Sequence, residues 1–492
     1  MAGIGIKLQK IYEKKTILSH LAGFGYSTVV TIAPMFLVIG NVMLMSAVLE
    51  FDSVGYARRG LFSGTLMYIF IFSLLTASPF NAVLSRYMSD VIYEEHYEDI
   101  MPCFNMGLLL NIIFSCAVGI PFCIREYMTG QVNLLFVFTG FCGYISLVLV
   151  FYSMLYLSIC KDYQKISLYY FLGMAAAFAM AYVLVKVFHR EIVYSMLLSL
   201  TSGFFLIAVL ELATIKRYFR RNSNHYRPVL TYFGKYWKLV VINFLYTLGL
   251  YIHNFVFWGT GLQMKVADSF VLAPSYDLAT CLAMFTNISA TIIFISRVEM
   301  YFHERYRDYS EAVIGGRWED IENTKLRMFR QLAGELQNLA RIQFIISVVV
   351  YLICLIVLPG LGYSGRVMQI YPCLAVGYFI LFLFYAEIIF LYYFNDLTGA
   401  LVATVSFCLI TFFVSRAAVS WEYLWYGSGL VVGSFVGFTV AYTRLRWVER
   451  HMDEHIFCKG TLFPEKKGKM PDPVVYKKSL FSFYKTQEEE KS

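Results

Sequence analysis

Uninterrupted apolar runs of about 20 residues or more recur along this sequence. An α-helix needs about 20 apolar residues to cross roughly 30 Å of bilayer hydrocarbon. Only 15% of the 492 residues are charged, against roughly 25% in typical soluble domains. The apolar material therefore exceeds what a globular core holds, and lipid is the expected solvent for most of the chain.

Charged residues divide the apolar material into twelve predicted spans. The first span is too long for the apolar core of a signal peptide and has no small-residue cleavage site, so we expect it to stay in the mature protein. The predicted fold class is an all-α integral membrane protein with twelve transmembrane helices. The spans cover residues 21–49, 60–84, 103–124, 132–160, 166–188, 192–215, 236–259, 275–297, 342–362, 367–394, 398–416 and 421–443.

The positions of Lys and Arg predict the orientation of these spans, because cytoplasmic loops are enriched in both residues. With the N-terminus in the cytoplasm, 33 of the 41 Lys and Arg residues fall on inner segments and 8 on outer ones. We therefore expect both termini to be cytoplasmic. The longest outer loop is roughly residues 260–274, which leaves no room for an extracellular domain.

Composition and motifs exclude several function classes. The net charge of +8 comes from residues between apolar runs, without the aromatic stacking surface expected of a nucleic-acid binder. The ten cysteines lie mostly within apolar runs and show no CxxC spacing, so neither a metal site nor a disulfide framework is predicted. The sequence contains no Walker A, HExxH or GxSxG motif. We expect neither an enzyme nor a cofactor.

Two amphipathic helices are predicted on the cytoplasmic side, between the eighth and ninth spans. The first places aromatic residues on one face of residues 299–313 and ends at Gly315-Gly316. The second begins with Glu319 and Asp320 and ends at Arg341, as the helix dipole favours. Such faces lie along a membrane or a partner protein. The predicted docking residues are Phe302, Tyr306, Tyr309, Leu332 and Leu336.

A weak internal repeat relates the ends of the second and eighth spans. Ser85-Arg86 precedes an acidic stretch at residues 95–99, and Ser296-Arg297 precedes a similar stretch about 210 residues later. The repeat predicts two six-helix bundles related by an axis along the membrane normal. The predicted domains are an N-terminal bundle (1–215), a cytoplasmic linker (216–235), a C-terminal bundle (236–450) with cytoplasmic helices at 298–341, and a basic cytoplasmic tail (451–492).

Carboxyl groups within the spans are candidates for ion coupling. Glu387 lies inside an otherwise apolar run, where a carboxylate costs several kcal/mol unless it faces a cavity or a partner. It is the candidate for proton or ion coupling, and a structural hydrogen-bonding role is the alternative. Glu211 lies nearer the cytoplasmic end of its span, where snorkelling or pairing with Lys216 is the simpler expectation.

Other polar residues at membrane depth are candidates for a substrate pathway. Span seven carries a polar stripe on one helical face, and span eight adds Asp277 and an asparagine. Hydrogen bonding between helices explains such residues equally well. Arg86 and Arg297 occupy matched inner positions and act either as headgroup anchors or as the mouth of the pathway. The candidate pathway residues are Arg86, Asn243, Tyr246, His253, Asn254, Asn287 and Arg297.

Four stretches of the sequence share a family resemblance. They are residues 2–8 (AGIGIKL), 84–94 (LSRYMSDVIYE), 249–258 (GLYIHNFVFW) and 297–302 (RVEMYF). Together they resemble the Pel exopolysaccharide transporter family (PelG), from residue 2 to about residue 450. The sequence departs from the family pattern at His253-Asn254, where charged residues are common, so ion coupling here can differ. The tail after residue 450 lies outside the resemblance.

The resemblance implies a MATE-like member of the multidrug/oligosaccharidyl-lipid/polysaccharide flippase superfamily in the cytoplasmic membrane. Its cargo would be a hexosamine-rich biofilm polysaccharide, made by a cytoplasmic glycosyltransferase (PelF-like), with PelD-like and PelE-like membrane partners. Two other functions stay open. One is a lipid-linked oligosaccharide flippase or small-molecule antiporter of the same superfamily, and the other is a non-transporting scaffold for a polysaccharide synthase.

Overall fold

The computed structural model describes residues 17–130, 132–160, 162–267, 270–294, 299–360 and 365–452. Contacts within the chain define two compact units, Met1–Leu445 and Arg446–Ser492. All packing described here lies within the first unit. Helix α16 begins in the first unit and ends in the second.

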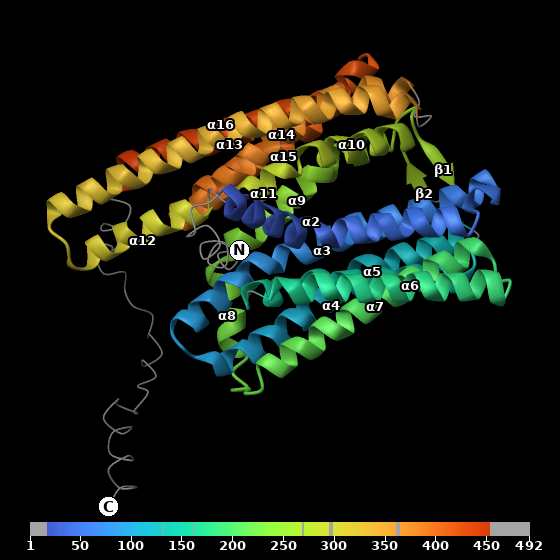
Figure 1. Cartoon of the computed structure of the whole chain (residues 1–492), viewed down its shortest axis with the longest axis horizontal. Coiled ribbons are helices and arrows are strands. Elements are labelled where there is room, and N and C mark those ends of the chain that lie inside the picture. Colours follow the sequence, from blue (N-terminus) through green and yellow to red (C-terminus); the bar gives the residue numbers. More distant parts are fainter. Residues whose placement is uncertain are drawn as a thin grey trace, which may run out of the picture. The chain divides into compact units, whose positions relative to one another are not determined.

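The described chain is almost entirely helical (Figure 1). The first half contains α2 (Ile17–Val48), α3 (Tyr56–Tyr93), α4 (Ile100–Thr129), α5 (Leu134–Ile159), α6 (Tyr163–Tyr182) with a π-helical end (Val183–Val187), and α7 (Ile192–Tyr218). The short α8 (Arg227–Lys235) follows. The second half contains α9 (Trp237–Phe257), β1 (Met264–Val266), β2 (Phe270–Leu272), α10 (Pro274–Asn287), α11 (Ser289–Ile293), α12 (Glu299–Gly315), α13 (Trp318–Gly360), α14 (Gly365–Tyr393), α15 (Leu397–Ala418) and α16 (Ser428–Arg450).

Each of the twelve predicted spans overlaps a described helix or helix pair, although several bounds differ. Ten helices in the described ranges are long and apolar enough to cross a membrane. The two predicted spans outside that ten are α2, whose shorter apolar part is Ala33–Val48, and the broken pair α10 and α11. The membrane-protein class is supported by these ten helices.

Helix α13 corrects the predicted boundary at Arg341. The sequence predicts that an amphipathic helix ends there and that the ninth span begins at residue 342. In the structure both belong to one helix of 43 residues, which is about 65 Å long and twice the thickness of the hydrocarbon core. No glycine or proline interrupts residues 335–345, so nothing in the backbone stops the helix at this point.

The longest predicted outer loop forms a small antiparallel hairpin that the sequence analysis did not anticipate. Strand β1 pairs with β2, with Lys265 opposite Val271. In Figure 1 this hairpin lies at one end of the helices, and α8 and α12 lie at the other. The charge distribution placed the loop outside and both helices in the cytoplasm. The hairpin end is called the outer end, and the opposite end the inner end.

Positive residues at the outer end are paired with carboxylates. Lys186 lies 2.9 Å from Glu50, and Arg58 lies 2.9 Å from Glu191. The hydrogen bond from Lys186 and its positive charge lower the pKa of the exposed Glu50 carboxyl. These pairs link the α2–α3 turn to the α6–α7 turn. They also account for several of the positive charges that fall on the predicted outer side.

The helices of each half pack in a similar order. In the first half α2 packs on α6, α3 on α5, and α6 on α7; in the second half α9 packs on α15 and α10 on α14. Helix α16 approaches α15 closely, because Gly429 and Gly433 lie against the backbones of Ser415 and Thr411. A side chain at either glycine would overlap α15, as in the small-residue helix contacts of membrane proteins.

The two halves meet along α3 and α9, from the contact of Tyr68 with Trp258 to that of Arg86 with Tyr236. The related contact between α2 and the α10–α11 pair is smaller. It consists of α2 against the short α11 and of Phe36 beside Phe285, with ring centroids 6.3 Å apart. Among the described residues, the seam between α3 and α9 is therefore the larger contact between the two halves.

Candidate functional site

Aromatic rings from four elements meet at the outer part of the seam between α3 and α9. Tyr68 of α3 stacks on Trp258 at the end of α9, with ring centroids 5.0 Å apart. One turn further along, Phe72 stacks on Phe255 at 6.1 Å. Stacked and edge-on ring pairs of this kind each contribute about 0.5–1.5 kcal/mol beyond their burial. These rings are called the outer seam: Tyr68, Phe72, Phe122, Phe255, Trp258 and Phe270.

The β1–β2 hairpin is attached to α3 beside the outer seam. The Tyr68 hydroxyl donates to the Val271 carbonyl (2.9 Å) and accepts from the Val271 amide (3.3 Å). A Cβ atom at Gly64 would lie 3.0 Å from a methyl of Leu272, so the glycine allows the hairpin to lie on the helix. The outer seam thus joins the first half to the hairpin as well as to α9.

Asp277 is the polar anchor of the outer seam. Its carboxylate accepts hydrogen bonds from the Trp258 indole (3.0 and 3.1 Å), the Asn254 side chain (2.8 Å) and the Ala273 amide (3.0 Å). These donors come from the end of α9 and the start of α10. The carboxylate therefore fixes the orientation of the Trp258 ring that stacks on Tyr68.

His253 is buried one residue before Asn254. Its Nδ1 lies 2.9 Å from the Tyr276 hydroxyl, and its Nε2 has no hydrogen-bond partner among the described residues. Asn254 likewise uses its amide NH2 on Asp277 and Thr280. Both predicted pathway residues therefore make contacts between helices α9 and α10, which is the hydrogen-bonding alternative that the sequence left open.

Arg86 lies at the inner part of the same seam. Its guanidinium donates to the Asn395 side chain (3.0 Å) and lies 4.2 Å from the centre of the Tyr236 ring. Asn395 connects α14 to α15, so the arginine links the two halves. This position agrees with either predicted role, the headgroup anchor or the mouth of a pathway. Arg297, its predicted counterpart, lies outside the described residues.

Helix α8 adds further contacts at the inner end. The Tyr232 hydroxyl donates to the Asp90 carboxylate, and its ring packs edge-on against Tyr87 at 5.2 Å. Burial raises the pKa of the Tyr232 phenol, and the hydrogen bond to Asp90 raises it further. The predicted linker is thus partly a helix, and this helix is attached to α3.

The other two pathway candidates of α9 face α14 and α15. The Asn243 amide donates to the Leu239 carbonyl (2.8 Å) and to the Tyr392 hydroxyl (3.4 Å). The Tyr246 ring lies 5.4 Å from that of Tyr385 and 6.1 Å from that of Phe407. Both side chains are half-buried. Both side chains therefore contact helices of the second half of the molecule.

Asn287 belongs to a separate polar cluster among α10, α13 and α14. Its amide donates to the Ala283 and Ala375 carbonyls, both at 3.0 Å, and its oxygen accepts from Ser347 at 2.7 Å. Gln343, fully buried, adds a longer bond of 3.4 Å. With its donors and acceptor in use, Asn287 joins three helices, and the structure does not bring it near the outer seam residues.

Glu387 is buried in the inner half of α14. Only 1% of the residue is exposed, and its Oε2 atom has no hydrogen-bond partner among the described residues. A carboxyl group without a partner at this depth costs several kcal/mol if it is ionised. The cost is smaller if the group carries a proton or binds a cation, which is the chemistry expected of a coupling site.

Glu211 corrects another expectation. The residue is fully buried, and its Oε2 atom accepts a 2.5 Å hydrogen bond from Ser153 of α5. It therefore neither snorkels to the membrane surface nor pairs with Lys216, because its side chain points between α5 and α7. Glu211 on α7 and Glu387 on α14 are thus both buried carboxyl groups within predicted spans, one in each half of the molecule.

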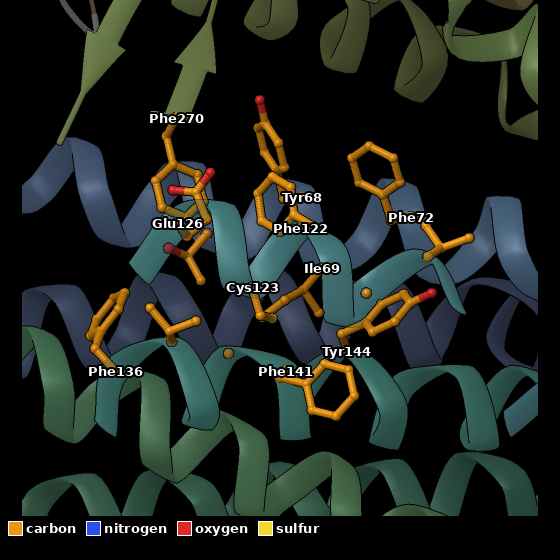
Figure 2. Close-up of a pocket in the computed structure, with 15 residues that line it drawn as sticks. Tyr68, Ile69, Phe72, Phe122, Cys123, Glu126, Phe136, Phe141, Tyr144 and Phe270 are labelled. Atoms are coloured by element: carbon orange, nitrogen blue, oxygen red, sulfur yellow. The ribbon is translucent and has the colours of Figure 1, made fainter. Parts of the chain in front are cut away.

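A small cavity of about 80 Å³ lies beside the outer seam, among α3, α4 and α5 (Figure 2). Its lining is mostly aromatic and aliphatic. Glu126 contributes a carboxyl group near Phe270. Such a lining favours an apolar chain or the apolar face of a ring. The aromatic residues that line it are Tyr68, Phe72, Phe122, Phe136, Phe141, Tyr144 and Phe270.

The predicted docking residues of α12 and α13 are covered by the chain itself. Phe302 is fully buried and packs edge-on against Phe390 with ring centroids 4.8 Å apart. Tyr309 and Leu332 are also buried, while Tyr306 and Leu336 are half-buried. This apolar face fixes the two helices to each other and to α14. A partner protein would have to contact their opposite, exposed faces.

The outer seam was not identified from the sequence. The chain has 88 aromatic residues, and no local pattern separates the rings of the seam from those expected at the membrane interfaces. Asp277 was noted only as a polar residue of the eighth span. Its three donors, from residues 254, 258 and 273, become visible only when α9 and α10 are folded together.

A family model covers almost all of the 492-residue chain. Residues 1–457 match the model PelG, "Putative exopolysaccharide Exporter (EPS-E)". The chain belongs to the PelG family. This confirms the resemblance drawn from the four sequence stretches and the expectation that the protein is a transporter, not an enzyme. A comparison with curated proteins found no match.

Solved structures with a similar fold are MATE transporters. An inward-facing multidrug resistance MATE family transporter of the MOP superfamily aligns with a TM-score of 0.58 at 12% identity, covering 86% of this chain and 96% of that one. An outward-facing structure gives the same TM-score and identity, covering 87% and 96%. A MATE in the straight conformation gives 0.56 at 11% identity, covering 87% and 96%. This PelG family member therefore has a MATE-like transporter fold.

Proposed function

We propose that this PelG family member exports a hexosamine-rich exopolysaccharide across the cytoplasmic membrane, between two six-helix bundles formed by α2–α7 and α9–α16. The match of residues 1–457 to an exopolysaccharide exporter family carries the proposal. The similar packing order of the two halves supports the two bundles. The seam between α3 and α9 supports a path that opens where the bundles meet.

Outward passage requires the outer seam to separate. The seam rings come from α3 and α4 on one side and from α9 and β2 on the other, so separation exposes them to the path. Aromatic rings then face a passing glycan, whose sugar rings have apolar faces. Arg86 and its Asn395 contact close the inner part of the same path.

The glycan is supplied by a cytoplasmic glycosyltransferase (PelF-like), with PelD-like and PelE-like proteins as membrane partners. Proton or ion coupling through Glu387 is a separate part of the proposal, supported by its buried Oε2 atom, which has no partner in the described chain. Extrusion by the glycosyltransferase is the other source of driving force.

A reconstituted vesicle assay tests this function. The protein is placed in vesicles with the glycosyltransferase and a labelled nucleotide sugar on one side. We expect glycan on the opposite side, protected from an added glycosidase on the synthesis side. Polymer retained on the synthesis side indicates the scaffold function, and transfer of a lipid-linked unit or a drug in its place indicates the other superfamily activities.

A further inference from the structure

The α12–α13 hairpin carries an exposed groove lined by arginine on the face opposite to its buried aromatic residues. The groove has a volume of about 330 Å³. Arg327 and Arg330 are exposed and form no ion pair with any described residue. Arg305 faces them from α12 and lies 3.3 Å from Asp308. This set is called the arginine groove: Arg305, Arg327, Arg330, Gln331, Gly334, Glu335 and Asn338.

The shape of the groove is held by the fold. Met328, Phe329 and Leu332 alternate with the groove residues along α13 and are buried. The Phe329 ring stacks on Phe394 with centroids 5.3 Å apart, which attaches α13 to the end of α14. At Gly334 a Cβ atom would meet nothing within 4 Å, so the floor of the groove is open. The buried face of α13 therefore positions the groove residues on the opposite, exposed face.

The groove lies beyond the reach of lipid headgroups. The apolar part of α13 begins after Arg341, and Arg330 precedes this residue by 11 positions, or about 16 Å along the helix. Even a tilt of 40° leaves about 12 Å, whereas the headgroup region extends roughly 5–8 Å beyond the hydrocarbon. An anionic partner in the aqueous cytoplasm fits this position better than a membrane phosphate.

Large apolar side chains are exposed near the tip of the same hairpin. Ile314 is 87% exposed, Trp318 66% and Leu326 52%. Leu326 lies directly beside the groove, one residue before Arg327. Because this part of α13 lies outside the predicted membrane, lipid does not account for their exposure. Exposed apolar residues next to unpaired arginines are typical of protein interfaces.

We propose that the arginine groove and the apolar tip dock an acidic surface of the cytoplasmic glycosyltransferase that supplies the glycan. This inference rests on the proposed function for the identity of the partner. In this proposal the docking surface consists of exposed residues of the hairpin. It does not include the predicted docking residues Phe302, Tyr309 and Leu332, which are buried. Docking here holds the glycosyltransferase on the helix that continues into the membrane as the apolar part of α13.

Binding of the purified glycosyltransferase to the full chain in phosphatidylcholine nanodiscs tests the proposal. We expect Arg327→Glu with Arg330→Glu to weaken binding at least tenfold, and Arg327→Lys with Arg330→Lys to weaken it less than threefold. Gly334→Leu, which keeps every charge but fills the groove, is expected to weaken binding at least fivefold. The matched control is Arg220→Glu with Arg221→Glu, which makes the same charge change at two exposed residues between α7 and α8, away from the hairpin, and is expected to change binding less than twofold.

Equal losses in the groove and control variants overturn the proposal, because net charge alone then explains binding. Unchanged binding in the Arg327/Arg330 variant also overturns it. A third outcome assigns the groove to lipid and also overturns the proposal. In that outcome phosphatidylglycerol stabilises the wild type but not this variant, and the affinity for the glycosyltransferase does not change. The vesicle assay with the wild type separates the two proposals: docking without export refutes the function, and export without groove-dependent docking refutes only the groove.

Discussion

Replacing Asp277 with asparagine tests the polar anchor of the outer seam. Asparagine keeps the shape of the side chain but turns one acceptor oxygen into an NH2 group. If the amide oxygen occupies the Oδ1 position, the Ala273 amide loses its 3.0 Å acceptor. If it occupies the Oδ2 position, the Asn254 side chain loses its 2.8 Å acceptor. Either orientation opposes a donor with another donor.

The expected loss of stability follows from these contacts. A hydrogen bond to a charged group contributes about 1.5–3 kcal/mol, and a buried donor without an acceptor costs about 1–3 kcal/mol. We expect Asp277→Asn to lower the free energy of unfolding by about 2–4 kcal/mol. Asp52, whose side chain is 99% exposed beside Arg59, provides the control. Asp52→Asn is expected to cost less than about 0.5 kcal/mol.

Equilibrium unfolding in mixed detergent micelles measures both variants. A double-mutant cycle with Trp258→Phe isolates the contact to the indole, and we expect a coupling energy of about 1–2 kcal/mol. An Asp277→Asn variant as stable as the wild type refutes the reasoning, because the carboxyl group is then not the ionised acceptor of all these donors. A zero coupling energy refutes the link between Asp277 and the stacked Trp258 ring.

Three further substitutions test other parts of the structure. Glu387→Gln is expected to abolish export while membrane insertion stays intact. Glu422 is exposed, and Glu422→Gln is the control. Normal secretion of polymer by the Glu387 variant refutes the coupling hypothesis. Gly433→Leu is expected to cost more than about 3 kcal/mol of stability, because α16 lies against Thr411 of α15. Gly40→Leu is the control and is expected to be tolerated, because a Cβ atom at Gly40 meets nothing within 4 Å. Equal stability of the two variants contradicts the helix contact. Arg86→Gln is expected to lower the free energy of unfolding by about 1–2 kcal/mol, because it removes the hydrogen bond to Asn395 and the contact with the Tyr236 ring. If the stability losses of Arg86→Gln and Asn395→Ala are additive in the double variant, the hydrogen bond does not form.

The sequence predicted the helices well because membrane-spanning segments are set by local composition. Runs such as residues 398–416 and 192–215 differ by only a few residues from α15 and α7. Predicted helix boundaries were wrong where the composition changes but the helix continues, as at Arg341 in α13. The β1–β2 hairpin was missed because three-residue strands have no measurable periodicity.

The site was harder to predict because its contacts join distant parts of the chain. Tyr68 and Val271 are 203 residues apart, and Arg86 and Asn395 are 309 apart. The stripe on α9 was visible from its spacing, but which neighbour each residue faces depends on tertiary packing. Glu211 shows the same limit, since its partner Ser153 lies on another helix and local sequence favours Lys216.

A disulfide across the outer seam tests the export path most directly. A Cβ atom at Gly60 of α3 would lie 3.2 Å from one methyl of Val266 in β1 and 3.8 Å from the other, so cysteine side chains at these two positions lie within reach of each other. Gly60→Cys with Val266→Cys is therefore expected to link the two bundles when oxidised. The wild type treated with the same oxidant controls for the native cysteines, nine of which are free in the described chain.

The measurement is the appearance of labelled glycan across the vesicle membrane before and after reduction of this disulfide. The proposed mechanism predicts that the oxidised variant exports little or no polymer and that reduction restores export to the wild-type rate. Export at the wild-type rate by the oxidised, fully cross-linked protein contradicts a path that opens between α3 and α9.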